Sequence, residues 1–127
     1  MGRRIRRLLG KLKGTPPALT TEELIRLVLD RTARPSDRDD AAIELGRHDD
    51  PAVEDALLRI VRDPTSSAVL TEDCGLSLAE IWSRRDRLDV PLAATLPPPA
   101  LRIALSVLKD RRPEWKGSLA ALDSSAN

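Results

Sequence analysis

A seven-residue segment occurs twice in this chain, first as Leu24-Ile25-Arg26-Leu27-Val28-Leu29-Asp30 and again as Leu57-Leu58-Arg59-Ile60-Val61-Arg62-Asp63. The copies lie 33 residues apart and differ in chemical class only where Leu29 corresponds to Arg62. Residues 39–46 and 72–79 match at the same offset, both in the order acid, acid, small, small, aliphatic, polar, Leu, small. Because two separate segments agree on one period, we interpret the chain as an internal repeat.

Helix-start and helix-stop residues flank each of these segments. Thr20 or Thr21, followed by two glutamates, predicts the start of the first helix, Ser36 is expected to cap the second, and Asp50 with Pro51 opens the third. The Pro97–Pro99 run predicts the start of a strongly apolar helix that we expect to be central in the fold. The expected helices are residues 20–30, 36–46, 51–63, 68–83 (or 71–83), 97–110 and 113–122, with a weak helical segment at 89–96.

Composition agrees with a helical core. Apolar residues make up 41% of the 127 residues, with two Trp and no Phe or Tyr, so the core must be built almost wholly from aliphatic side chains. Small residues at matching repeat positions, Ala41, Ala42, Cys74 and Gly75, allow consecutive helices to approach closely. These features predict helix pairs stacked on one another, each pair needing its neighbours to bury its apolar face.

Residues 36–63 resemble one unit of the short bacterial HEAT-like (armadillo-type) repeat. The resemblance rests on Ala41-Ala42-Ile43-Glu44-Leu45-Gly46, on Asp49-Asp50-Pro51-Ala52-Val53 and on Leu57-Leu58-Arg59-Ile60-Val61. It covers about residues 20–110, and it implies an all-α solenoid of about five to six helices. HEAT-like proteins are chiefly protein-binding scaffolds, and some relatives act on bilin chromophores or on nucleic acid. The resemblance transfers no individual functional residue, because the matching positions are structural.

The start of the chain differs sharply in charge from the rest. Six cations and no acid occur in residues 1–13, which we call the basic arm: Arg3, Arg4, Arg6, Arg7, Lys11 and Lys13. Removing these six from the 21 Lys and Arg leaves fifteen bases against twenty acids, so the remainder carries a net charge of −5. The sequence therefore divides into an arm with a Pro/Gly linker at 1–17, a helical-repeat domain at 18–122 and a frayed tail at 123–127.

Several roles fit the basic arm. Its aliphatic residues recur at helical spacing, so it could dock on the first helix of the body or fray, contact an anionic membrane or nucleic acid, or bind a protein partner. No uninterrupted apolar segment typical of a secretory signal follows the basic start, and we expect a cytoplasmic protein.

Charged residues recur on the side of the first and third helices opposite the aliphatic stripe. Glu22 and Arg26 hold the same repeat places as Asp55 and Arg59, and Arg62 extends the row. We call these five residues the charged ridge and take them as the candidate protein-binding surface. In a repeat unit such as residues 36–63, the helix that carries them is expected to be the second of the two, and stacked second helices line the concave side of such solenoids. Trp115 is either the anchor of the last helix or an exposed binding hot spot.

Catalytic and metal-binding interpretations have little support. One His and one Cys exclude most zinc sites, and the acids at 37–40 lack the Gly and Glu that an EF-hand loop requires, because Ala42 and His48 stand there. Cys74 is expected to be a buried, inert thiol. We therefore expect a non-enzymatic protein-binding module without cofactor or metal. The alternatives are a peripheral adaptor recruited by the basic arm, and a chromophore-lyase-like or other enzyme.

Overall fold

The computed structural model describes residues 18–125, and the predicted arm and linker at 1–17 lie outside them. All regular secondary structure in the described chain is helical, with no strand, as the sequence predicts. It contains seven α-helices, where five or six were expected. In chain order the elements are α2 (Thr21–Leu29), α3 (Pro35–Leu45), α4 (Pro51–Arg62), α5 (Ala68–Arg84), α6 (Val90–Ala93), α7 (Pro98–Arg111), the 3-10 turn η1 (Pro113–Trp115) and α8 (Lys116–Ser125).

Most helix starts follow the predicted capping residues. Thr20 and Glu23 form a reciprocal capping box at α2, and the Asp50 carboxylate accepts from the Ala52 amide at α4. Ser67, which the sequence analysis did not single out, caps α5. The predicted Ser36 cap is wrong. The second helix begins one residue earlier, at Pro35, because a proline in the first helical position has no amide hydrogen to leave unsatisfied.

Helix α5 is the centre of the molecule. It packs against α3, α4 and α7, and its contact with α7 is the most extensive between any two described elements. The prediction that the helix at 97–110 would be central is therefore wrong. Helix α7 is covered chiefly by α5 and α8, and Ile103 and Val107 on its surface are only half-buried.

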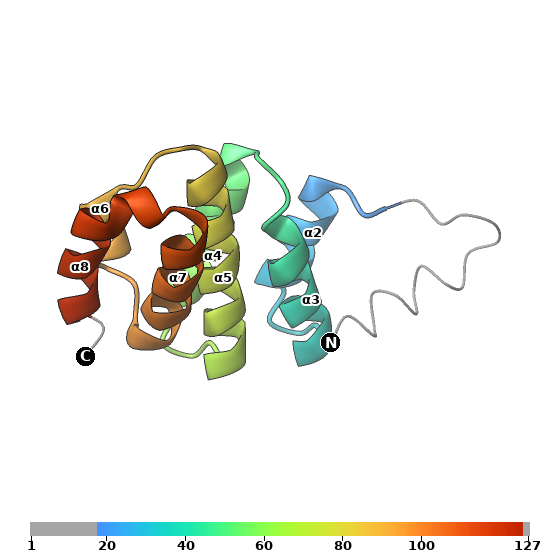
Figure 1. Ribbon diagram of the computed structural model, residues 1–127. Helices are drawn as coiled ribbons and strands as arrows, with labels where there is room; N and C mark the ends of the chain where they lie inside the picture. The colour runs from blue at the N-terminus through green and yellow to red at the C-terminus, as the bar shows by residue number, and fades with distance from the viewer. Residues whose placement is uncertain (1–17, 126–127) are drawn as a thin grey trace.

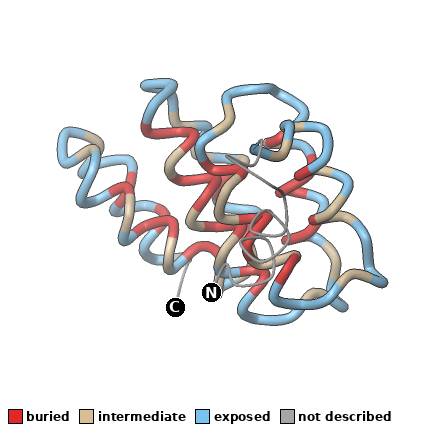
Figure 2. The backbone as a smooth tube through the Cα atoms, turned by 90° about the vertical axis from the view of Figure 1, so that its right-hand side faces the viewer, coloured by how far each residue is buried: buried red, intermediate tan, exposed pale blue. Residues whose placement is uncertain are grey.

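The helices follow one another in pairs across the molecule (Figure 1). Helix α2 packs on α3, and α4 packs on α5. The first members of these pairs, α2 and α4, contact each other, and the second members, α3 and α5, contact each other. Figure 2 shows buried residues gathered where the helices face one another. One apolar cluster runs from Leu24 in α2 to Leu122 in α8.

Two small residues set how closely the second helices approach. A Cβ atom added at Gly75 of α5 would lie 2.5 Å from the Ala100 carbonyl oxygen and 2.7 Å from the Ala100 Cα of α7. On the other side of α5, a Cβ at Gly46 would lie 2.8 Å from the Ser77 Oγ, which donates a 2.6 Å hydrogen bond to the Ala42 carbonyl at the end of α3. Helix α5 is thus held against α3 and α7 nearly backbone to backbone.

The turns after α2 and α4 are built identically, one repeat period apart. Asp30 accepts hydrogen bonds from the amide and hydroxyl of Thr32, and Asp63 accepts the same pair from Thr65. These bonds, first the one from the threonine hydroxyl, lower the pKa of both carboxyls. Arg31 in the first turn forms a salt bridge to Asp63 in the second. The sequence repeat is therefore also a repeat of local structure.

The close contact at Gly75 gives the first prediction. Gly75→Ala should lower the free energy of unfolding by about 1–3 kcal/mol, because the new methyl group meets the backbone of Ala100, which cannot rotate away. Gly117→Ala in α8 is the matched control, because nothing lies within 4 Å of a Cβ there, and it should leave stability unchanged or raise it by up to about 1 kcal/mol. Urea denaturation of both variants checks this. Equal changes in the free energy of unfolding for the two variants would contradict the close contact between Gly75 and Ala100.

The repeated turn gives the second prediction. Asp30→Ala and Asp63→Ala should both lower the melting temperature at pH 7. Because each native pKa lies below the ordinary aspartate value of about 3.9, the stabilisation is present above that value and is lost as the pH falls through the native pKa. The effect of both substitutions should therefore shrink between pH 5 and pH 3. Asp110→Ala, at an exposed carboxylate of α7, is the control and should leave the melting temperature at pH 7 nearly unchanged. A fall in melting temperature for only one of the two variants would show that the two turns are not equivalent.

Candidate functional site

The charged ridge lies where solvent can reach it. All five members, Glu22, Arg26, Asp55, Arg59 and Arg62, are exposed on α2 and α4. None of them forms a hydrogen bond or salt bridge with another residue in the range 18–125. Nearby charged residues differ: Glu54 on α4 pairs with Arg85, and Asp49 pairs with Arg84. The ridge charges are therefore not used to hold the described helices together.

The ridge lies on the first and third helices, as the sequence analysis placed it, but these helices are not the second members of the packed pairs. Helices α2 and α4 are the first members of the pairs α2–α3 and α4–α5, whereas the second members are α3 and α5. The expectation that the ridge lies on stacked second helices is therefore wrong. The error arose because an exposed face can be recognised from the spacing of charges along one helix, but its layer depends on which helices pair.

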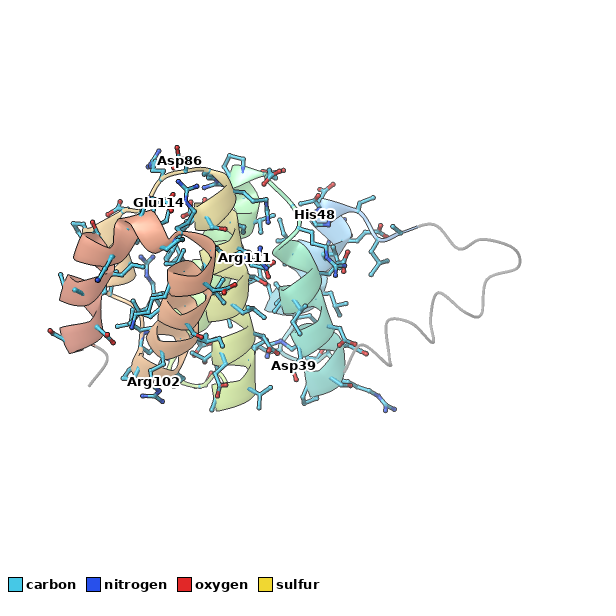
Figure 3. All side chains as sticks on the ribbon, in the orientation of Figure 1. Asp39, His48, Asp86, Arg102, Arg111 and Glu114 are labelled. Atoms are coloured by element: carbon cyan, nitrogen blue, oxygen red, sulfur yellow. The ribbon has the colours of Figure 1, made fainter. Side chains whose placement is uncertain are left out.

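Trp115 is half-buried and packs against the apolar core. The Arg112 guanidinium lies over its ring, 4.5 Å from the ring centre. The same guanidinium donates to the Ser83 carbonyl near the end of α5 and forms salt bridges with Asp86 and Glu114, which lie close together in Figure 3. Of the two roles considered for Trp115, this geometry favours the anchor.

The anchor role gives the third prediction. Trp115→Ala should lower the free energy of unfolding by about 2 kcal/mol, since both core packing and the cation–π contact are lost. Val69→Ala removes an apolar side chain that is 56% exposed and should change stability by less than about 0.5 kcal/mol. Thermal and urea denaturation of both variants measure the difference. An unchanged stability for Trp115→Ala would return that side chain to the list of candidate binding residues.

A second charged site lies between α3 and α5. Asp39 and Asp40 on α3 come close to Glu72 and Asp73 on α5, and we call these four residues the acid cluster. Burial above all, and then the neighbouring Asp39, Glu72 and Asp40 carboxylates, raise the pKa of Asp73 to about 6. Burial and the Asp40 carboxylate also raise the pKa of Asp39, against the opposing effect of Arg38.

The acid cluster contains buried oxygen atoms without hydrogen-bond donors. Asp40 retains only 7% of its exposure, and its Oδ2 atom has no donor; the Oδ2 atom of Asp73 is likewise buried without one. A buried carboxylate oxygen without a donor is costly. Among residues 18–125, no group of three His, Cys, Asp or Glu side chains has the arrangement needed to hold a metal ion.

Sequence reasoning missed the acid cluster, although its signal was present. The acids at 37–40 were considered as a calcium-binding loop and rejected, and the matching acids at 72–73 served only to establish the repeat. Because repeat-equivalent helices stack, residues at equivalent positions come together, and an acidic pair in one copy meets the acidic pair in the next. The repeat period, combined with the matched acids, could have predicted the cluster.

The single histidine and cysteine form no catalytic arrangement with each other or with an acid among the described residues. His48 shares a 2.6 Å hydrogen bond with the Thr21 hydroxyl, while the adjacent Asp49 pairs with Arg84. Cys74 is fully buried, and burial raises the pKa of its thiol, so the thiolate form is disfavoured. The prediction of a buried thiol is confirmed.

No known protein family, curated protein or solved structure matches this chain. Within residues 18–125, no helix combines the length and apolar character needed to cross a bilayer. The candidate membrane or nucleic-acid residues of the basic arm lie outside the described residues.

Proposed function

We propose that this chain is a HEAT-like helical-repeat module that binds another protein through the charged ridge. The repeated Asp–Thr turns and the contacts of α2 with α4 and of α3 with α5 support a solenoid-like stack of helix pairs. In such stacks each layer of like helices presents an extended surface to partners. The proposed activity is binding, without a catalytic step.

The observation that carries the proposal is the absence of internal partners for the ridge within residues 18–125. Five charged side chains of both signs stand on two adjacent helices, repeat their order from one copy of the repeat to the next, and make no hydrogen bond or salt bridge there. Alternating unpaired charges of this kind give a protein partner both orientation and selectivity, because a wrongly registered partner places like charges together.

The fourth prediction tests the ridge by a charge exchange. The double variant Asp55→Arg with Arg59→Glu keeps the net charge and the i, i+4 pair of opposite signs, so stability should change by less than about 0.5 kcal/mol. A partner captured by the wild-type protein from its host and identified by mass spectrometry should lose at least tenfold in affinity, since reversed charges at a contact cost more than about 1.4 kcal/mol.

The matched control is Glu44→Arg with Arg47→Glu. It exchanges an existing exposed ion pair at the end of α3, which is not part of the ridge, and also keeps the net charge. This variant should bind the partner with wild-type affinity. Equal affinity of the ridge variant and the wild type, or equal losses in both variants, would contradict the ridge as the binding surface.

A further inference from the structure

The acid cluster requires hydrogen-bond donors that the described residues do not supply. Asp40 is more than nine-tenths buried, and its Oδ2 atom points to no donor, as does the buried Oδ2 of Asp73 on the facing helix. Two such oxygens, at equivalent positions of successive repeats, are thus brought to one place on the α3–α5 interface. A cation held at the accessible side of the cluster, beside Asp39, Glu72 and Asp73, would relieve the repulsion among these carboxylates.

The cations on neighbouring elements are engaged elsewhere or lie to one side. Arg38 on α3 is near enough to lower the pKa of Asp39, but its Nε donates a 2.9 Å hydrogen bond to the Val28 carbonyl of α2. Arg102 on α7 lines a small cleft together with Glu72, at the same end of the molecule as Asp39 (Figure 3). Within residues 18–125, neither arginine forms a salt bridge with the cluster.

We propose that the acid cluster is the docking site for the basic arm of the same chain, which places a lysine or arginine from residues 3–13 against the accessible carboxylates of Asp39, Glu72 and Asp73. The arm carries six cations and no acid, while the rest of the chain carries a net charge of −5. Opposite charges on one tethered chain meet at a high effective concentration, so an arm that fits the cluster occupies it without a second molecule. This inference is independent of the charged ridge, which lies on the other layer of helices.

The tether is long enough for this contact. The Thr21–His48 hydrogen bond fixes the start of α2 beside the turn that follows α3. From His48 back to Asp40 is eight residues of mostly helical chain, or roughly 12 Å along the axis. The five residues from 18 back to Lys13 can span roughly 17 Å, and the eleven residues back to Arg7 roughly 36 Å. The cations of the arm can therefore reach the acid cluster.

Carbodiimide cross-linking of the full-length protein tests the proposal. The reagent joins a lysine amine to a carboxylate only where the two are in contact, and the arm holds two of the chain's four lysines, Lys11 and Lys13. We expect the monomer to yield peptides that link one of these lysines to Asp39, Glu72 or Asp73. Their yield should fall several-fold in 1 M NaCl, where the screening length is only about 3 Å.

Two double variants separate a specific site from general attraction. Asp39→Asn with Asp73→Asn should remove most of the arm cross-links, including those to Glu72. Asp55→Asn with Asp110→Asn makes the same change in net charge at two exposed carboxylates away from the cluster and should leave the yield unchanged. Arm cross-links spread over many acids of the surface, or equal losses in both variants, would overturn the proposal.

The source of the occupying arm is tested by mixing isotopically labelled and unlabelled protein. Linked peptides that are wholly labelled or wholly unlabelled, without mixed-label species, support the proposal, whereas abundant mixed-label peptides would assign the site to a second copy and overturn it. A carboxyl NMR titration gives a further readout that needs no change in the cluster. The pKa of Asp73 should be lower in the wild type than in a variant whose six arm cations are replaced by glutamine, because a docked cation favours the ionised carboxylate. Equal values in the two proteins would exclude docking at Asp73.

Discussion

The close approach of α5 to its neighbours is the constraint on which the rest of the structure depends. Gly75 lets the backbone of α5 meet that of α7 at Ala100, and Gly46 admits Ser77 of α5 against the end of α3. Because α5 also contacts α4, it joins both layers of helices. The aliphatic core, which has no Phe or Tyr to fill wide gaps, becomes dense only at such short separations.

The same stacking explains the two contrasting charged surfaces. On the first helices, the ridge positions point away from the neighbouring helix, so charges of both signs stay exposed and unpaired within the described chain. On the second helices, the matching acids Asp40 and Asp73 lie at the interface, where burial and like charge raise the pKa of Asp73. The two layers thus hold their charges in opposite settings, exposed on α2 and α4 and partly buried between α3 and α5.

Local features of the fold were predictable from the sequence, and features set by helix pairing were not. Thr20, Asp50 and the proline run gave correct helix starts because caps act within one turn of chain. The exposure of the ridge and the burial of Cys74 followed from helical periodicity. The layer of the ridge, the central place of α5 and the acid cluster depend on which helices face one another, and the spacing along a single helix does not contain that information.

The last helix, α8, covers one end of the described helices. Leu119 and Leu122 of α8 are fully buried, and α8 packs on α6 and α7, although its sequence does not continue the repeat. By burying these two leucines against α6 and α7, α8 shields apolar surface at this end of the described chain from water, so removing α8 would expose an apolar patch there.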